Sequence, residues 1–328
     1  MRVFVTGATG FIGSHISDVF HKNGIIVRCG IREKSNLQWL KDKPFELVKY
    51  SLDDLKSLSN ALEDVDYVIH CGGTISANKQ EDFFHINTQG TIKLLEAAKE
   101  YSNQIKRFIY ISSQTAAGPA RALAEPVKEA DETKPITTYA KSKRKAEEAV
   151  LKYGMHFPVT ILRPSAVVGP RDYAIFPIFK SIKNRLAILI GFKPKYLNLI
   201  HSSDLAEATY LASMNENTIG KIYFIAAEKP VTWNEVMKIL KNELNIRFTI
   251  NIKFPHFVVL SAAYTFQQFR RLIGNPHPFN LDKGRDFIQK YWICSIDNAK
   301  KDFGFSPKLD AREAVIDTLK WYIENKWM

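Results

Sequence analysis

The chain has 328 residues, of which 45% are hydrophobic and 24% are charged, as expected for a globular protein with a large buried core. Its three cysteines, Cys29, Cys71 and Cys294, show no CxxC spacing and no neighbouring histidine pair, which excludes a disulfide framework and a metal site and agrees with a reducing cytoplasm. The net charge of +12 comes without a nucleic-acid-binding motif, so nucleic acid is excluded as a partner.

Apolar strand-like runs alternate with helical patterns through the first half of the chain. The runs predicted as strands are residues 2–6, 25–30, 45–50, 66–70, 107–112 and 158–163, and the clearest helices are 83–101 and 139–153. Strands separated by helices are typical of a parallel sheet with helices on both faces. The sequence therefore predicts an α/β protein with a Rossmann-type, doubly wound parallel sheet.

The pattern becomes irregular after Arg163, where several prolines break the chain into loops. From residue 232 to 327 it is mainly helical and amphipathic. We predict an NAD(P)-binding Rossmann domain of residues 1–165 plus about 199–228. Residues 166–198 and 229–328 are then expected to form a smaller, mostly helical substrate-binding domain.

The longest apolar runs, 186–192 and 257–266, fall well short of the roughly 20 residues that a membrane-spanning helix needs. A strand-like run begins at residue 2, which leaves no room for a signal peptide. We expect a cytoplasmic protein, either free or peripheral to a membrane.

No acidic residue occurs between Asp172 and Asp204, although five basic ones do. These basic residues are Lys180, Lys183, Arg185, Lys193 and Lys195. A basic and apolar segment, here 180–195, can face an anionic substrate, an acidic carrier protein or a lipid surface. The alternative is a solvated surface with no partner.

Three glycines, Gly7, Gly10 and Gly13, follow the first predicted strand and open a predicted helix. Glycines at such a turn let the backbone approach a pyrophosphate, and the helix N-terminus offers unpaired N–H groups to it. This position predicts a dinucleotide site.

The stretch TGATGFIGSH (6–15) has the form used by the extended branch of the short-chain dehydrogenase/reductase superfamily, the NAD-dependent epimerases, dehydratases and reductases. The sequence resembles this family in further motifs along nearly the whole chain, and the segment 254–280 is similar to the added helix of steroid-dehydrogenase-like and flavonoid-reductase-like members. The motifs are IHCGG (69–73), NTQGTIKLLEAA (87–98), YISSQTAAGP (110–119), YAKSK (139–143), LRPSAVVGPRD (162–172), HSSDLAEA (201–208) and DNAKKDFGFSPKLDAREAV (297–315).

The resemblance implies which residues hold the nicotinamide cofactor. Asp53 matches the aspartate at the adenine end, although it could instead cap a helix beginning near Leu55. Asp204 matches a family aspartate that we interpret as a helix cap. The residues assigned to the cofactor are Gly7, Thr9, Gly10, Phe11, Ile12, Gly13, Arg32, Leu52, Asp53, Cys71, Gly72, Gly73, Asn87, Tyr139, Lys143, Pro164 and Ser165.

Arg32 decides the expected form of the cofactor. NAD sites usually carry a carboxylate at the end of the second strand, but here that position is Ile31, followed by Arg32. An arginine suits the 2′-phosphate of NADP, and Arg28, Lys34 and Ser35 could add contacts. Glu33 is the competing carboxylate. We expect NADP, with NAD as the alternative.

Tyr139 and Lys143 are four residues apart and therefore share one face of the predicted helix. A free tyrosine has a pKa of about 10, and a nearby ammonium would lower it toward the range of a useful acid/base. The resemblance implies that Ser113 hydrogen-bonds the substrate oxygen, that Tyr139 exchanges its proton, and that Lys143 also holds the nicotinamide ribose. A charged helix surface with no catalytic role is the alternative that these matches displace.

The expected reaction is hydride transfer between the nicotinamide and a ketone or secondary alcohol of a hydrophobic, acyl or sterol-like substrate. Apolar residues of 173–199, among them Tyr173, Phe176, Phe179 and Phe192, suggest this substrate, although core packing explains most such aromatics. A nucleotide-sugar 4-epimerase with recycled NAD is the main alternative, and a dehydratase is weaker because Gln114 and Thr115 replace the usual acids. A non-catalytic dinucleotide sensor is a minor alternative. The resemblance also implies a homodimer formed through helices 83–101 and 139–153.

Overall fold

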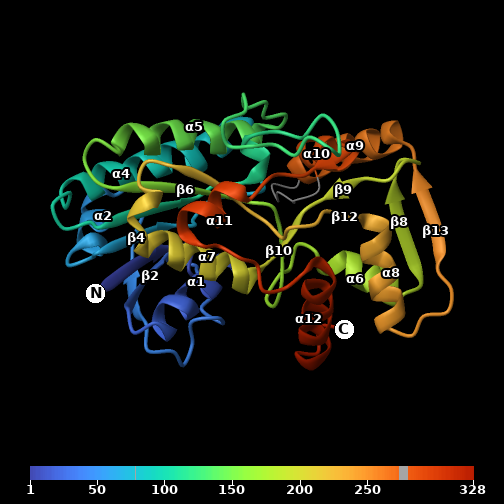
Figure 1. Cartoon of the computed structure of the whole chain (residues 1–328), viewed down its shortest axis with the longest axis horizontal. Helices are drawn as coiled ribbons and strands as arrows, with labels where there is room; N and C mark the ends of the chain where they lie inside the picture. Colours follow the sequence, from blue (N-terminus) through green and yellow to red (C-terminus); the bar gives the residue numbers. More distant parts are fainter. Residues whose placement is uncertain (78, 273–279) are drawn as a thin grey trace.

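The centre of the molecule is one sheet of seven parallel strands (Figure 1). These strands are β1 (Arg2–Thr6), β2 (Ile26–Ile31), β3 (Glu46–Lys49), β4 (Tyr67–His70), β5 (Arg107–Ile111), β6 (Val159–Pro164) and β11 (Ile222–Ile225). Their order across the sheet is β11-β6-β5-β4-β1-β2-β3. The direction of winding reverses between β1 and β4, and ligands of such sheets bind at the carboxyl ends of the strands at this point.

The computed structural model describes residues 1–77, 79–272 and 280–328. It confirms the Rossmann-type fold and the six strands predicted from the sequence, with ends that differ by at most one residue. Strands β4, β5 and β6 are buried along their whole length, as parallel strands covered on both faces must be. The seventh strand, β11, was not among the predicted strands.

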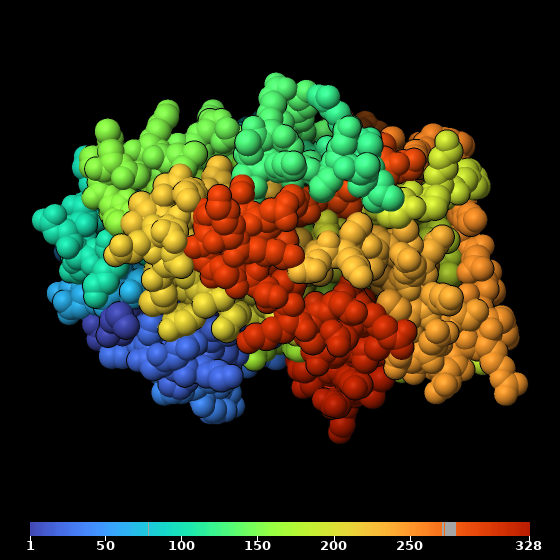
Figure 2. All heavy atoms as spheres, in the orientation of Figure 1, coloured from blue at the N-terminus to red at the C-terminus, as the bar shows by residue number. Residues whose placement is uncertain are grey.

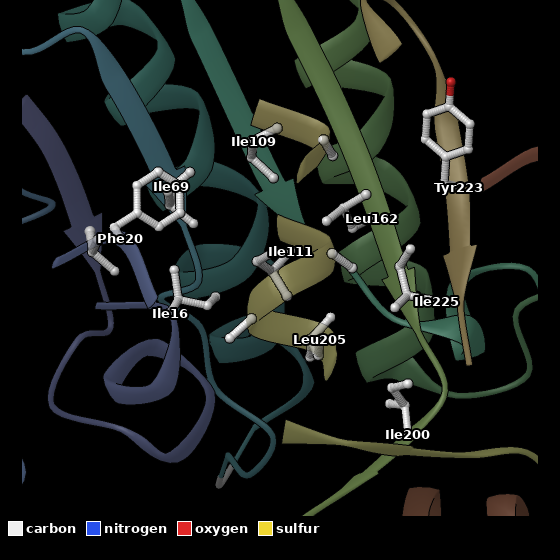
Figure 3. Close-up of a cluster of buried hydrophobic side chains, with 14 of the residues drawn as sticks. Ile16, Phe20, Ile69, Ile109, Ile111, Leu162, Ile200, Leu205, Tyr223 and Ile225 are labelled. Carbon is white, nitrogen blue, oxygen red and sulfur yellow. The ribbon is translucent and has the colours of Figure 1, made fainter. Parts of the chain in front are cut away.

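Helices cover both faces of the sheet. One face carries α1 (Phe11–Lys22), α7 (Ser202–Met214) and α11 (Asp297–Phe303), and the other carries α2 (Leu55–Leu62), α4 (Gly90–Lys99) and α5 (Thr138–Tyr153). In the core of the first face, Ile16 and Phe20 of α1 and Leu205 of α7 pack under the strand residues Ile109 and Ile111 (Figure 3). These layers leave the carboxyl ends of the strands for the candidate site.

The predicted helix 83–101 is continuous but not uniform. It consists of α3 (Gln80–Phe83), a π-helical segment η1 (Phe84–Gln89) and α4. π-helical turns inside helices are frequent at functional sites, and this one carries Asn87.

The rest of the chain adds helices and three small sheets, so it contains more strand than its sequence suggested. The small sheets pair β10 with β7, β9 with β12 and β14, and β8 with β13. The elements are η2 (Gln114–Ala116), β7 (Ala166–Val168), α6 (Phe176–Lys183), β8 (Leu186–Ile190), β9 (Tyr196–Leu197), β10 (Leu199–His201), η3 (Glu216–Thr218), β12 (Val231–Thr232), α8 (Trp233–Glu243), β13 (Ile250–Phe254), α9 (His256–Leu272), α10 (Leu281–Ile288), β14 (Tyr291–Trp292) and α12 (Ala311–Glu324).

The segment 254–280, expected to carry an added helix, contains α9, and its residues 273–279 lie outside the described residues. Across the described parts of the chain, every helix is too short or too polar to cross a membrane.

Asp204 does not cap α7 as predicted. The N-terminal cap is His201, whose side chain accepts a hydrogen bond from the backbone N–H of Ser203. Asp204 is buried in the first turn and accepts hydrogen bonds from the backbone N–H groups of Lys308 (3.1 Å) and Leu309 (3.0 Å). It therefore joins α7 to the loop before α12.

Candidate active site

The turn between β1 and α1 has space for glycine alone at two positions. Gly7 has a φ of +71°, and a Cβ there would lie 2.9 Å from the backbone nitrogen of Gly72. A Cβ on Gly13 would lie 2.2 Å from the carbonyl oxygen of Gly7, so the turn and the first turn of α1 are in direct contact. Gly10 caps α1 without a side-chain hydrogen bond, which leaves N–H groups of the helix N-terminus for a ligand. The predicted residues Thr9, Phe11 and Ile12 lie partly exposed in the same turn.

This arrangement fits a dinucleotide. The backbone cradle would hold the pyrophosphate, since a side chain at Gly7 or Gly13 would fill the space beside it. The turn lies at the reversal of strand order, where the fold type places its ligands.

A cavity of about 490 Å³ lies past the carboxyl ends of β2 and β3, where the adenine end of a dinucleotide would extend. Its lining includes the predicted residues Arg32, Leu52 and Asp53. Asp53 pairs with Lys93 at 2.7 Å, and that hydrogen bond and charge hold the pKa of the Asp53 carboxyl below its usual value. The helix cap of α2 is Asp54, not Asp53, because Asp54 accepts the hydrogen bond from the N–H of Ser57.

Arg32 is exposed directly after β2 and remains the arginine available at this cavity. The expectation that Arg28 could add contacts is wrong. Its guanidinium is bound to Glu46 (2.9 Å) and to the carbonyl oxygens of Ala61 and Glu63. Glu33, the competing carboxylate, lies 3.4 Å from Lys49 in an exposed pair.

The predicted residues Cys71, Gly72 and Gly73 follow β4 and face the glycine turn or η1. The N–H of Gly72 donates to Thr6 Oγ1 (3.0 Å), while a Cβ on Gly73 would approach Asn87 Oδ1 at 3.0 Å. Burial raises the pKa of Cys71 to about 11, so its thiol stays neutral.

Asn87 binds protein groups with both ends of its amide. Its Oδ1 accepts from the N–H of Thr74 (2.7 Å), and its Nδ2 donates to Ser142 Oγ (3.0 Å). It thus ties the loop after β4 to α5, next to the cofactor region, and a role in positioning that loop follows from this geometry.

Ser113 and Tyr139 are brought together at the carboxyl end of β5. Ser113 follows the strand and opens η2, with its Oγ 2.9 Å from Thr115 Oγ1. Tyr139 lies in the first turn of α5. Burial raises the pKa of Tyr139 to about 12, a hydrogen bond with Ser113 acts in the opposite direction, and the charge of Asp286 adds to the rise.

Lys143 is buried one turn further along α5. Its Nζ donates to the carbonyl oxygen of Ile111 (2.7 Å) and lies 4.2 Å from the centre of the Tyr110 ring. Burial lowers the pKa of Lys143 to about 8. The predicted lowering of the Tyr139 pKa by this ammonium is not seen, because burial of the phenol dominates. Tyr139 therefore holds its proton at neutral pH.

Pro164 and Ser165 lie where β6 ends beside β11, with the N–H of Ser165 donating to the carbonyl of Ile225 (3.0 Å). Within the described residues, the hydroxyl oxygen of Ser165 is buried and has no hydrogen-bond partner. A buried polar atom without a partner costs free energy unless a ligand or water satisfies it.

Sequence reasoning missed the contribution of α10. Asp282 accepts a hydrogen bond from the N–H of Thr138 (2.7 Å) at the start of α5. Asp286 is buried, burial raises its pKa to about 6, and its Oδ1 has no partner in the described part of the chain. No motif marks these aspartates, since only the fold carries α10 across to α5.

Next to Asp286 in the sequence, Phe287 lines an apolar cavity of about 300 Å³. The cavity lies between α6, β8, α8 and the start of β9, and its lining includes Ile178, Ile188, Ile190, Phe192, Trp233 and Met237. One short helix therefore borders both the tyrosine and the apolar cavity.

The four aromatic residues expected to face an apolar substrate have different roles. Tyr173 stacks on Trp327 with ring centres 4.2 Å apart, and Phe176 also packs on Trp327. Phe179 is fully buried and Phe176 packs against the same core, so core packing explains these two, whereas Tyr173 is 57% exposed. Phe192 is 70% exposed and lines the apolar cavity.

No cluster of three or more His, Cys, Asp or Glu side chains in the described ranges is arranged to hold a metal ion. The cysteines Cys29, Cys71 and Cys294 are free thiols.

Comparison with known proteins places this architecture among nicotinamide-dependent enzymes. The model of the NAD dependent epimerase/dehydratase family matches residues 3–226. The ceramide reductase of Caulobacter vibrioides is 25% identical over 327 residues, covering 99% of this chain and 96% of that protein. The 3 beta-hydroxysteroid dehydrogenase/Delta 5→4-isomerase of Mycobacterium tuberculosis is 26% identical over 348 residues, covering 98% of this chain and 90% of that protein. The crystal structure of UDP-glucose 4-epimerase from Thermotoga maritima superimposes with a TM-score of 0.81 and 21% identity over 99% of this chain and 100% of that one, which shows a shared fold.

Proposed function

Because this chain belongs to the NAD dependent epimerase/dehydratase family, the extended short-chain dehydrogenases/reductases, we propose that it interconverts a ketone and a secondary alcohol on a hydrophobic substrate. The family consists of dehydrogenases, reductases and epimerases, so the expectation of an enzyme is confirmed and a non-catalytic sensor is set aside. The proposed substrate is acyl or sterol-like, and the proposed acid/base is Tyr139.

The observation that carries this proposal is the position of α10. Its Asp282 holds the start of α5, its Asp286 acts on Tyr139, and its Phe287 lines the apolar cavity. A substrate that fills the cavity with an apolar group would therefore extend past α10 toward the phenol. The names of the two relatives, a ceramide reductase and a steroid dehydrogenase, state hydrophobic substrates and support the same class.

In the direction of reduction, Ser113 would donate a hydrogen bond to the substrate carbonyl and Tyr139 would protonate its oxygen. A neutral phenol is needed for this step, and burial keeps Tyr139 neutral by raising its pKa to about 12. An alkoxide is a stronger base than a phenolate, so the proton passes readily to the new alcohol. The nicotinamide, when bound, supplies the hydride.

Lys143 would hold the sugar next to the nicotinamide. Its ammonium has three N–H donors, of which one binds the carbonyl of Ile111 and another faces the Tyr110 ring. A third donor is left for a ligand. With a pKa of about 8, Lys143 is mostly protonated at neutral pH.

For the cofactor we propose NADP. The guanidinium of Arg32 borders the same cavity as Asp53. Among the described residues no carboxylate forms an ion pair with it, since Asp53 is paired with Lys93 and Glu33 with Lys49. A guanidinium binds a phosphate with two parallel hydrogen bonds, which a ribose hydroxyl cannot accept.

The test of the mechanism is Tyr139→Phe, with Tyr153→Phe on the same helix as the matched control. We expect NADPH-dependent reduction of hydrophobic ketones to fall about 10²–10⁴-fold in Tyr139→Phe, as for loss of a general acid. Binding of NADPH, followed by its fluorescence, should be unchanged, and the control should keep full turnover. Turnover by Tyr139→Phe at the rate of the control would refute the assignment.

A second measurement separates the reductase from a nucleotide-sugar 4-epimerase. An epimerase returns the hydride to the same substrate and keeps its cofactor, whereas a reductase exchanges it at each turnover. Freshly purified protein is denatured and the released nucleotide is identified. Protein that releases none and then binds added NADPH tightly supports the reductase, whereas near-stoichiometric NAD would overturn it in favour of the epimerase.

A further inference from the structure

Two segments that lack acidic residues are paired with each other in the fold. One lies between Asp172 and Asp204 and the other between Glu243 and Asp282. They meet because β8 and β13 pair in parallel, from Leu186 opposite Ile250 to Ile190 opposite Phe254. In Figure 1 these strands form one end of the molecule together with α9.

Basic side chains are exposed on this end. They are Lys180, Lys183, Arg185, Lys193, Arg247 and Lys253. The acids of the neighbouring helices face other groups: Glu243 pairs with Arg312 at 3.0 Å, and Asp282 binds the start of α5. The charge presented by the two segments is therefore positive throughout.

Large apolar side chains are exposed among these charges. They are Phe192, Phe248, Ile250, Phe257, Tyr264 and Phe269. Phe192 and Phe257 are each 70% exposed, whereas Ala263 on the opposite side of α9 is fully buried. The outward side of α9 is thus more apolar than an ordinary solvated helix surface. We call these twelve basic and apolar residues the basic apolar face, and the orange and yellow-green atoms at the far end of Figure 2 show its position.

We propose that the basic apolar face docks on the surface of an anionic lipid bilayer. A protein surface on which phenylalanine and isoleucine are surrounded by lysine and arginine inserts at the boundary between lipid headgroups and acyl chains. Each basic residue near an anionic membrane adds attraction, and no acid in these segments opposes it. A second copy of the chain does not fit this face, because a two-fold contact would bring its positive charges against themselves.

The apolar cavity opens on the same face, since Phe192, Lys193 and Lys253 belong to both. Gly191 has a φ of +76°, and a Cβ there would lie 2.5 Å from His256 Nε2, so a glycine is required where β8 meets the start of α9. The next residue, Phe192, is exposed at the rim of the cavity. The geometry then provides a route by which a hydrophobic substrate passes from the bilayer into the cavity without crossing water. This route rests on the proposed function.

The test is co-sedimentation of the full chain with vesicles of phosphatidylcholine alone or mixed with phosphatidylglycerol. We expect binding to the mixed vesicles, weaker binding to phosphatidylcholine, and loss of binding as salt is raised. The variant Lys183→Glu/Phe257→Ser should reduce the partition coefficient by about tenfold or more. The matched control is Lys152→Glu/Met155→Ser, which changes the same charge and removes an apolar group that is also exposed, at the last turn of α5 and just after it. The control should bind as the unmodified protein does.

No binding to mixed vesicles, or equal loss in both double variants, would overturn the proposal. So would a dimer, seen without lipid by size-exclusion chromatography, that Lys183→Glu/Phe257→Ser alone dissociates. The vesicles contain no substrate, so this readout does not depend on turnover. Reduction of a short water-soluble ketone tests the proposed function separately, and both double variants should retain it because neither changes a residue of the cavity.

Discussion

The buried ion pair between α5 and β6 should be a main support of the candidate site. Glu147 lies one turn after Lys143 on α5, is fully buried, and receives Arg163 of β6 through two hydrogen bonds of 2.9 and 2.7 Å. Ser112, next to Ser113, also donates to Glu147 at 2.6 Å. This one carboxylate therefore connects α5 to the ends of β5 and β6.

Replacing Glu147 by leucine leaves the guanidinium of Arg163 charged and buried. Breaking a buried pair from one side costs about 3–5 kcal/mol, since the remaining charge has lost both water and its partner. The value applies here because Arg163 is only 1% exposed and its bonds to Glu147 are bidentate. For a chain of 328 residues this corresponds to a fall in the melting temperature of about 4–7 °C.

The assay is denaturant and thermal unfolding followed by circular dichroism. Glu148→Leu is the control, because Glu148 is the next residue, is half-exposed and makes only a 3.6 Å contact with Arg144, so its loss should cost less than about 1 kcal/mol. The double variant Glu147→Leu/Arg163→Met should recover much of the lost stability, since apolar groups then replace both charges. A Glu147→Leu variant as stable as the control, or a double variant no better than the single one, would refute the reasoning.

Four further predictions concern the site. Asp286→Asn should lower the pKa of Tyr139, moving the alkaline limit of a pH–rate profile to lower pH, because the negative charge of Asp286 raises that pKa; an unmoved limit would count against the contact. The same variant should be more stable than the unmodified protein by about 2–3 kcal/mol above pH 6, and this gain should vanish below pH 4. The reason is that folding raises the pKa of Asp286 from 3.8 to about 6, so ionising this carboxyl lowers the stability of the unmodified protein as the pH rises. Gly13→Ala should abolish NADPH binding in a fluorescence titration, since the new Cβ would lie 2.2 Å from the carbonyl oxygen of Gly7. Normal NADPH binding by this variant would exclude the glycine turn as the phosphate site. Arg32→Ala should weaken NADPH binding about tenfold or more while leaving NADH binding unchanged, and Lys34→Ala is the control. An equal loss of affinity for both cofactors would contradict the NADP proposal.

The sequence alone predicted the central sheet well. Its inner strands β4, β5 and β6 are covered on both faces and buried along their whole length, and runs such as 2–6 and 107–112 correspond to strands that end within a residue of the prediction. The glycine turn was also predicted from the sequence, because a tight turn and a close backbone approach restrict positions 7 and 13 to glycine. Ser113 and Tyr139 could be paired because a strand end and a helix start hold them at a spacing shared by the family.

Side-chain partners distant in the sequence were decided by tertiary structure. Arg28 was free to be a cofactor ligand until the fold put Glu46 beside it, and Asp204 looked like a cap until the loop before α12 supplied its donors. The pKa of Tyr139 likewise depends on burial and on Asp286 of α10 rather than on Lys143 in its own helix.

The basic apolar face shows the same division. Each segment without acidic residues could be identified in the sequence. The two segments become neighbours only because β8 pairs with β13, some sixty residues apart along the chain. Periodicity and spacing report which groups a residue has within one or two turns of its own element. The ionisation state, burial and accessibility of a side chain depend on every group within a few ångströms of it. Which groups these are is determined only when the chain is folded.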